Sequence, residues 1–339
     1  MKSTFCIVED RQNWEQSLKL LLLSLTVHSP GVSINLFYPL AGPEFSQWAE
    51  CHPHVRVQTW RPKGPGWDVK PEAALALLCE GFEEVIWIDS DVIVCRDAIA
   101  PFRGLAKETF ATTVDIPSAQ RNGSGAARAQ SWGFEVHRGL PFNPNLGVFR
   151  ATSAHQRLLE RWAELLASPD YVACQQMDWR ARPFYMMGDH DPLAALLCSA
   201  EFSDVPVHFL RGGADVLHFC GVTGYPLAQR MRHLLFGPPA FVHSMGTKPW
   251  AHRWAEASPG LLGWFEDRYL DQSPYTLYAA QLGRHAGLHC DWMEPHSGFS
   301  RALRALGAGS PPLTGLPIAA LADLSRLLTS ARSLISARK

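Results

Sequence analysis

The first hundred residues alternate short apolar runs with helix-forming segments, and this alternation limits the fold more than any other feature. The apolar runs read as continuous strands, which is typical of a parallel sheet covered by helices on both faces. The sequence therefore predicts an α/β fold. We expect strands at residues 4–10, 32–39, 55–60 and 84–92, and helices at 13–25 (capped by Asn13), around 43–51 and at 70–82.

The same alternation continues after residue 100. Residues 117–142 form a polar stretch longer than a compact domain usually spends on a connection, so we expect either a disordered insertion or a lid over a site. Residues 296–316 are rich in Gly, Ser and Pro and are expected to form a linker. The remaining expected elements are strands at 108–116, 145–153, 206–210, 215–219 and 240–246, and helices at 154–168 and 191–200.

Charge and cysteine content narrow the class of protein. The chain has 31 basic and 32 acidic residues, so its net charge of −1 gives no electrostatic attraction to nucleic acid. Its 8 cysteines form no Cys-x-x-Cys pair and look like buried thiols in a reducing compartment. The apolar stretch at the N-terminus is too short for a signal peptide, and residues 18–27 are too short to cross a bilayer. We therefore expect a cytoplasmic protein.

Residues 317–339 have apolar side chains at helical spacing and an excess of basic residues. A basic amphipathic helix of this kind can lie on an anionic membrane, at the inner face of the cell membrane. Packing on the domain or on a second copy explains the same pattern. Both interpretations stay open at the level of sequence.

A second constraint is the segment WIDSDV at residues 87–92, where an apolar strand ends in Asp89 and Asp91. Burying an unpaired carboxylate costs several kcal/mol, so two of them at a strand end suggest a metal held by oxygen ligands. The triplet alone is a weak signal, because Asp189-His190-Asp191 repeats it and Asp89 could instead cap a helix. The position of Asp89-Ser90-Asp91 supports a metal site, since ligands bind beyond the carboxyl ends of strands in such sheets.

Four segments in order resemble the family-8 retaining glycosyltransferases, which include glycogenin and bacterial lipopolysaccharide galactosyl- and glucosyltransferases. The resemblance runs from about residue 4 to residue 255. The segments are WIDSDV (87–92), NLGVF (145–149), GDHDPLAALL (188–197) and HSMGTKPW (243–250).

This resemblance implies a GT-A fold, with a mixed, mostly parallel sheet flanked by helices and a helical C-terminal extension. A catalytic domain would span residues 1–295, with a donor-binding half at 1–116, a lid or acceptor loop at 117–142, and a sugar and acceptor half at 143–255. The linker 296–316 and the basic helix 317–339 would follow. The implied activity is metal-dependent, retaining transfer of a hexosyl unit from a UDP-sugar to a saccharide or lipid-linked acceptor, as in lipopolysaccharide or other polysaccharide biosynthesis.

The resemblance also implies a metal site. Asp89, Asp91 and His243 would bind Mn²⁺ or Mg²⁺, and the cation would neutralise the leaving diphosphate. A lone histidine after an apolar run is more often a core residue, but its place in HSMGTKPW favours a ligand. Gly246 and Lys248 would face the diphosphate, although the spacing from His243 to Lys248 is one residue shorter than the family pattern.

The nucleotide and sugar contacts follow from the same resemblance. Lys70 would reach the phosphates, with an exposed lysine as the alternative. Trp14 would stack on the uracil, where a core aromatic is the alternative, and Trp250 is expected to pack. Glu9 and Asp10 would contact the base or ribose, and Ser90 lies between the metal-binding carboxylates.

Asn145 and Asp189 would contact the donor sugar, with Gly147 letting the chain pass close by. His190 stands where the family has glutamine. A histidine cannot replace an amide carbonyl, so a mechanism with a covalent intermediate on that glutamine cannot be inferred for this chain. Front-face displacement needs no strong enzymic base, and the substitution does not exclude it.

Two other functions compete. A haloacid-dehalogenase-like phosphatase also has an apolar strand followed by Asp-x-Asp, but that strand is normally the first of its fold and its later acidic pair is missing from this sequence. A catalytically silent, membrane-attached scaffold would be compatible with the departures at His190 and Lys248.

Overall fold

The structure is a computed structural model that describes residues 2–58, 66–116, 120, 122–220, 225–252, 264, 267–268, 270–324 and 327. The chain divides into two compact units, each assembled from separate stretches. The first comprises Met1–Gln12, Ser29–Ser90 and Ile99–Arg211, and the second comprises Asn13–His28, Asp91–Ala98 and Gly212–Lys339. One boundary falls between Ser90 and Asp91, inside the Asp-x-Asp triplet.

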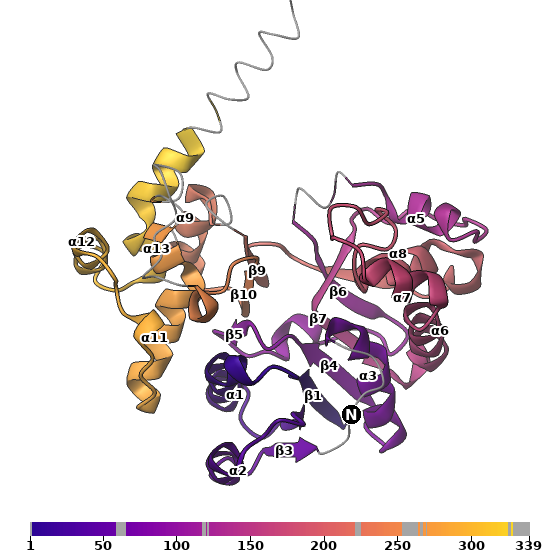
Figure 1. The fold of residues 1–339 in the computed structure, drawn as a ribbon, viewed down its shortest axis with the longest axis horizontal. Helices are drawn as coiled ribbons and strands as arrows, with labels where there is room; N and C mark the ends of the chain where they lie inside the picture. The colour runs from indigo at the N-terminus through magenta and orange to yellow at the C-terminus, as the bar shows by residue number, and fades with distance from the viewer. Residues whose placement is uncertain are drawn as a thin grey trace, which may run out of the picture. The chain divides into compact units, whose positions relative to one another are not determined.

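The first unit contains a seven-stranded sheet in the order β3-β2-β1-β4-β7-β6-β8 (Figure 1). Strand β7 runs antiparallel to both β4 and β6, and the other neighbours are parallel. The predicted mixed, mostly parallel sheet is therefore confirmed. The strands are β1 (Ser3–Val8), β2 (Ser33–Phe37), β3 (Val55–Gln58), β4 (Glu84–Ile88), β6 (Phe110–Val114), β7 (Pro144–Thr152) and β8 (Val207–Leu210).

Three helices share one apolar core with β4 and β7: α3 (Lys70–Cys79), α6 (Gln156–Leu166) and α8 (His190–Cys198). The buried residues of α6 recur at helical spacing, so one face of this helix is apolar and packs on the sheet. On that face Trp162 lies edge-on to Phe149 of β7, with 5.8 Å between the ring centroids. Other helices of this unit are α2 (Pro43–Glu50), α5 (Gly125–Ser131), α7 (Pro169–Gln175), η2 (Gly66–Val69), η3 (Ala100–Phe102), η4 (Ser153–His155) and η5 (Ala200–Phe202).

The second unit contains a three-stranded sheet in the order β5-β10-β9. Strand β10 (Phe241–Met245) pairs antiparallel with β5 (Val92–Val94) and parallel with β9 (Val216–Cys220). Its core joins these strands to α1 (Glu15–His28), α11 (Pro274–Ala286) and η8 (Asp291–Met293). The unit also contains η7 (Pro249–Ala251), α9 (Leu227–Phe236), α12 (Gly298–Leu306) and α13 (Pro311–Thr314), and η1 spans Gln12–Trp14.

The strand expected at 84–92 is two strands. Strand β4 ends at Ile88, and β5 begins at Val92 in the other sheet. The polar residues between them interrupt the apolar run, so each half joins the sheet that buries its own side chains. Asn13 lies inside η1, and α1 begins at Glu15 instead of after an Asn13 cap.

The expected lid at 117–142 contains α5, whose N-cap Ser124 accepts a hydrogen bond from the Ala127 N–H at 3.2 Å. The region is therefore helical in part instead of being one long loop. Residues 117–119 and 121 lie outside the described residues.

The expected linker at 296–316 contains α12 and α13. Its Gly, Ser and Pro residues serve as caps and first-turn residues there, and Leu303 of α12 packs with Phe219, Leu270 and Ile318 in an apolar cluster. Residues 316–324 are helical and Leu327 is helical and exposed, while the rest of the expected helix 317–339 lies outside the described residues.

All eight cysteines are free thiols. Cys6, Cys174, Cys198 and Cys290 are buried, whereas Cys51 and Cys79 are exposed, so the expectation of buried thiols holds for part of the set. Within the described ranges, every helix is too short or too polar to cross a bilayer.

A buried ion pair ties β4 to β7 and gives a test of this core. Arg150 donates to Glu84 and to the carbonyl oxygens of Ala106 and Thr109. We expect Arg150→Met to lower the free energy of unfolding by about 3–5 kcal/mol, because it leaves a buried carboxylate without its cation. Urea unfolding followed by circular dichroism measures this loss.

The matched control is Arg157→Met, which removes an exposed arginine paired with Glu201 at 3.1 Å. Such surface pairs contribute about 0–1 kcal/mol. Equal losses from the two variants would show that the Arg150 pair does not stabilise the core.

Candidate functional site

The carboxylate of Asp89 is fixed at the end of β4. The Asp89 N–H donates to the carbonyl oxygen of Gly147 at 2.8 Å, and the indole N–H of Trp87 donates to Asp89 Oδ1 at 2.6 Å. Lys70 Nζ lies 3.1 Å from the same oxygen. Asp89 is thus held by three groups of the first unit, one of which is the Lys70 ammonium.

Lys70 is buried, so the alternative of an exposed lysine is wrong. It is 3% exposed, and its Nζ lies 3.1 Å from Asp189 and donates to the carbonyl oxygen of Leu146 at 3.1 Å. Burial disfavours the charged ammonium, but Asp189 and Asp89 outweigh it and raise the pKa of Lys70. Lys70 therefore links the Asp-x-Asp triplet to the Asp-His-Asp triplet within the first unit.

Asp91 makes its contacts within the second unit. His243 Nε2 lies 3.2 Å from its Oδ1, and the ammonium of Lys248 contacts its Oδ2. Burial disfavours the carboxylate, but Lys248 and His243 outweigh it and hold the pKa of Asp91 well below its usual value. Asp91 Oδ1 is buried, and the two oxygens of Asp91 lie against a histidine and a lysine of the second unit.

His243 is oriented by the second sheet. Strand β10 places it opposite Val92 on β5 and His218 on β9. Its Nδ1 lies 3.1 Å from Nδ1 of His218, and one of these two nitrogens donates to the other. A hydrogen bond on one ring nitrogen fixes the direction of the other, and here it leaves Nε2 facing Asp91.

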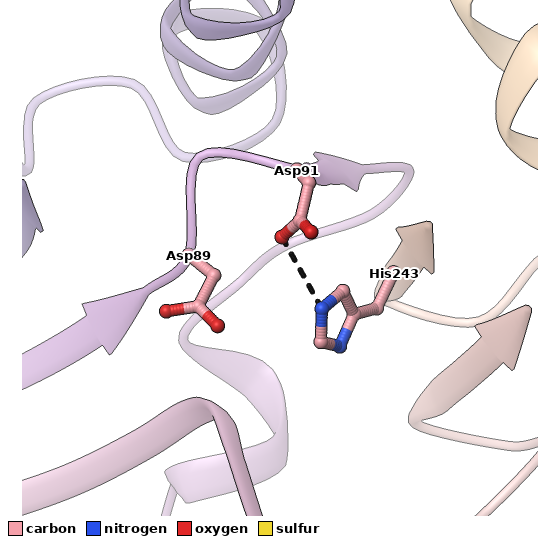
Figure 2. Close-up of side chains that lie close together, drawn as sticks. All are labelled: Asp89, Asp91 and His243. Atoms are coloured by element: carbon pink, nitrogen blue, oxygen red, sulfur yellow. Dashed lines mark ion pairs between the residues drawn. The ribbon is translucent and has the colours of Figure 1, made fainter. Parts of the chain in front are cut away.

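Asp89, Asp91 and His243 could together hold a metal ion (Figure 2). One ligand atom from each lies within 4.8 Å of the others. The chain itself sets this separation, because one residue separates the two aspartates and β5, which starts directly after Asp91, pairs with the strand of His243. Two carboxylates and an imidazole suit Mn²⁺ and Mg²⁺, so these residues fit the metal expected from the sequence.

Gly246 and Lys248 follow β10. Gly246 has φ +72°, a left-handed conformation that favours glycine, so the turn requires this residue. The Lys248 ammonium contacts Asp91 and the carbonyl oxygen of Ser244, and it lies 5.6 Å from the centre of the Trp14 ring. Lys248 is therefore close to the expected metal ligand.

Trp14 packs edge-on against Trp250, with ring centroids 5.1 Å apart. Trp250 in turn packs with Tyr275 and Trp292, as expected for a packing residue. Trp14 is half-buried at the edge of this aromatic cluster, and its ring lies near Lys248.

Glu9 supports the Asp-x-Asp turn from β1. Its carboxylate accepts hydrogen bonds from Ser90 Oγ at 2.5 Å and from Arg11 Nε at 2.8 Å. Asp10 is exposed and accepts a hydrogen bond from the Gly66 N–H at 3.1 Å. Glu9 and Ser90 thus hold each other in place beside Asp89, and Asp10 is the more accessible acid.

His190 lies among three carboxylates in the first unit. Its ring nitrogens are 3.6 Å from Asp189, 3.6 Å from Asp191 and 3.9 Å from Asp115, and its side chain is 27% exposed. Burial lowers the pKa of the imidazole, but Asp191, Asp189 and Asp115 outweigh it and raise the pKa to about 9. The ring is therefore an imidazolium at neutral pH and carries an N–H on both nitrogens.

Asn145 belongs to the same cluster. Its Nδ2 donates to Asp115 at 3.2 Å, and its Oδ1 accepts from the Gly147 N–H at 3.0 Å. Asp189 is 5% exposed; burial disfavours its charged form, but Lys70 and His190 outweigh it and lower its pKa. The structure thus brings together Asn145, Asp189 and His190, the three residues expected to contact the sugar.

Sequence reasoning missed two members of this cluster. Asp115 follows β6 and has the same strand-end position as Asp89, a signal that could have found it. Arg128 of α5 is 2% exposed and donates to Asp191 at 2.7 Å and to Asn143 at 3.2 Å. Nothing in its sequence context indicates this, because its partner is 63 residues away.

The comparisons with known proteins agree with the fold. No protein-family model matches the chain, and no curated protein matches its sequence. The crystal structure of an active-site mutant of LgtC is similar with a TM-score of 0.51 at 15% identity, over 84% of this chain and 95% of that one. The apo structure of the bifunctional glycosyltransferase WbbM is similar with a TM-score of 0.50 at 15% identity, over 73% of this chain and 46% of that one.

At these identities the likeness shows the fold alone. LgtC is a galactosyltransferase, and its likeness to this chain identifies the mixed α/β arrangement as a GT-A-type glycosyltransferase fold. Family 8, expected from the four segments, stays a prediction.

The state of His190 can be tested by the pH dependence of stability. Its pKa is raised from 6.5 to about 9, so its stabilising contribution is complete below pH 6.5 and is lost as the pH rises through 9. We expect the melting temperature of wild type to fall relative to that of His190→Gln between pH 7 and pH 10. Differential scanning fluorimetry in overlapping buffers measures both.

The control is His285→Gln on the surface of α11, which should follow wild type across the range. A constant difference between wild type and His190→Gln at all pH values would mean that His190 is not held as an imidazolium.

Proposed function

We propose that this protein is a family-8-type retaining glycosyltransferase that transfers a hexosyl unit from a UDP-sugar to a saccharide or lipid-linked saccharide. The observation that carries the proposal is the grouping of Asp89, Asp91 and His243 at the end of β4 in a GT-A-type fold. Strand-end carboxylates of an α/β sheet are placed where such folds bind ligands.

Asp89, Asp91 and His243 are the proposed ligands of Mn²⁺ or Mg²⁺. A divalent cation supplies positive charge against the diphosphate that leaves the donor sugar. Lys248 adds a second positive charge at Asp91, and the glycine at 246 lets a backbone N–H approach a phosphate closely. Lys70 is held at Asp89 and Asp189 and is proposed to fix these two carboxylates against the donor.

The nucleoside is proposed to contact Trp14 and Asp10. Asp10 is exposed at the end of β1 and can accept a hydrogen bond from a base or ribose. Glu9 and Ser90 are bonded to each other, so we propose that they position the Asp-x-Asp turn on which the nucleotide binds.

The proposed catalytic residues are Asn145, Asp189 and His190, which would contact the donor sugar. An imidazolium has no lone pair on nitrogen, so His190 cannot be a nucleophile or a base at neutral pH. This favours front-face displacement, in which the leaving phosphate accepts the proton of the acceptor hydroxyl. The residues then act by position and charge.

Nucleotide binding tests the proposal. We expect UDP with Mn²⁺ to raise the melting temperature of wild type by several degrees, whereas UDP alone or Mn²⁺ alone gives a smaller shift. Asp91→Asn should abolish the metal-dependent part, because it removes the charged ligand. Thermal shift assays with UDP, GDP and phosphate, each with and without Mn²⁺, measure this.

Asp291→Asn is the matched control, since Asp291 is an exposed acid on η8. If no nucleotide raises the melting temperature of wild type, the result would contradict the glycosyltransferase proposal and favour a catalytically silent scaffold. Mg²⁺-dependent release of phosphate from an aryl phosphate would instead favour a phosphatase.

The protein is also proposed to bind the inner face of an anionic membrane from the cytoplasm, through α9 and the C-terminal helix of the second unit. The inner face of α9 is polar, with Arg230 and His233 buried, and its outer face is apolar. The outer residues Leu235 and Phe236 are 71% and 69% exposed, and Met231 and Leu234 are 46% and 40% exposed.

The C-terminal helix adds to this surface. Asp323 accepts a hydrogen bond from the Leu227 N–H at 2.9 Å, which places the helix beside the start of α9. It exposes Leu321, Leu324 and Leu327. Helix α9 has no acidic residue, and the exposed Arg232 lies among its apolar side chains. Apolar side chains with basic neighbours fit anionic lipid headgroups, whereas two such cationic faces would repel each other.

We expect the double variant Leu235→Ser, Phe236→Ser to bind vesicles containing phosphatidylglycerol about tenfold more weakly, because it removes the most exposed apolar area. Vesicle sedimentation measures this. Leu306→Ser on α12 is the control, since Leu306 is 83% exposed outside α9. Unchanged vesicle binding, or a dimer in solution that the double variant dissociates, would contradict the membrane role.

A further inference from the structure

The first unit has an open hollow of about 480 Å³ lined by residues outside the proposed donor site. Its lining comes from the segment before Asp189 and from the expected lid: Asn122, Gly123, Trp179, Arg180, Arg182, Phe184 and Met187. None of these residues has a role in the proposed donor site. The volume is in the range of small-ligand pockets, so the hollow is large enough for a sugar unit.

Two aromatic rings give the hollow an apolar wall. Trp179 is 58% exposed, which is unusual for so large an apolar side chain. Phe184 packs against Gly123, where a Cβ would lie 2.8 Å from the Phe184 ring and where φ is +96°. A larger residue at 123 would be strained and would push the ring away, so glycine builds this wall.

Two arginines make the same wall cationic. The guanidinium of Arg180 lies 5.3 Å from the centre of the Trp179 ring. Arg182 is fixed by hydrogen bonds to Gln175 O at 2.9 Å and Met187 O at 3.0 Å. In the described part of the chain neither guanidinium has a carboxylate within ion-pair distance, and Asp178 accepts from the backbone N–H of Arg180 at 2.9 Å.

The hollow is connected to the catalytic cluster through the core. Arg128 lies 5.8 Å from the centre of the Phe184 ring and donates to Asp191 at 2.7 Å. Met187 is followed at once by Gly188 and Asp189. The wall of the hollow is therefore linked, through Arg128 and the chain at Met187, to the residues proposed to hold the donor sugar.

From this geometry we propose that the hollow is an acceptor subsite for an anionic saccharide, a sugar unit that carries a carboxylate or a phosphate. The flat face of a sugar ring packs on Trp179, and guanidinium groups bind planar carboxylates and phosphates by paired hydrogen bonds. The acceptor role rests on the proposed glycosyltransferase function, whereas binding of the anionic sugar does not.

Binding of small sugars tests the subsite. Saturation-transfer NMR and calorimetry are run on the full chain with methyl β-glucuronide, glucose 6-phosphate and methyl β-glucoside. We expect both anionic sugars to bind and the neutral glucoside to bind at least about tenfold more weakly, because it lacks the charged contact. The carboxylate and phosphate arms show which anion fits better.

Variants locate the site. Arg180→Gln should weaken binding of the anionic sugars about tenfold and leave binding of the glucoside unchanged. Arg180→Lys keeps the charge and should lose less affinity than Arg180→Gln. Trp179→Ala should weaken binding of all three sugars. The control is Arg161→Gln, an arginine elsewhere on the first unit that pairs with Glu164 at 2.7 Å. Equal affinity for charged and neutral sugars, or equal effects of Arg180→Gln and Arg161→Gln, would overturn the proposal.

The thermal shift with UDP and Mn²⁺ separates the two proposals. If wild type responds to UDP but does not prefer the anionic sugars, the subsite is wrong and the glycosyltransferase proposal stands. If it prefers the anionic sugars without any response to a nucleotide, the acceptor role fails together with the glycosyltransferase proposal. If UDP without metal prevents binding of the anionic sugars, the nucleotide itself occupies the hollow, and the acceptor-subsite proposal is wrong.

Discussion

The charge balance of Asp89 and Asp91 is the constraint on which the site depends. Each carboxylate faces a lysine of its own unit, Lys70 at Asp89 and Lys248 at Asp91. Asp91 is buried, and a buried carboxylate without a cation would cost several kcal/mol, so Lys248 is needed to stabilise it there. Asp91 Oδ1 lies 3.2 Å from His243 Nε2, beside the oxygen that contacts Lys248. Lys70 and Lys248 thus balance the charges of the two carboxylates that are proposed to bind a metal.

Much of the first unit was predictable because its signals are local. Apolar runs of strand length, separated by amphipathic segments, specified the strands and helices of the sheet, and β7 and α8 begin within one residue of where the apolar pattern starts. The grouping of Asp89, Asp91 and His243 was also predicted, since strand-end carboxylates and the histidine of HSMGTKPW are visible in the chain. These features depend on residues that are neighbours in sequence, and periodicity reports such neighbours well.

The features that were missed depend on distant residues. The passage of the chain from one unit to the other inside Asp89-Ser90-Asp91 is decided by the pairing of β5 with β10, about 150 residues later. Burial of Lys70 requires Asp189, and Arg128 acquires its role from Asp191. The helices α12 and α13 were expected as a linker because Gly, Ser and Pro also mark loops, and only the burial of Leu303 and Ile318 distinguishes caps from a linker here.

His190 shows how such distant partners decide chemistry. At the position of a neutral amide in the resembling family, this chain carries an imidazolium, and a positive charge beside a donor sugar would oppose an oxocarbenium-like transition state. The surrounding residues reverse that effect. Asp115, Asp189 and Asp191 face His190, and Arg128 pairs with Asp191, so three carboxylates stand against two cations while Lys70 is balanced by Asp89. The cluster keeps one net negative charge, with the histidine protonated. On the proposed function, the substitution therefore removes a hydrogen-bond acceptor and adds a positive charge, in a cluster whose net charge stays negative.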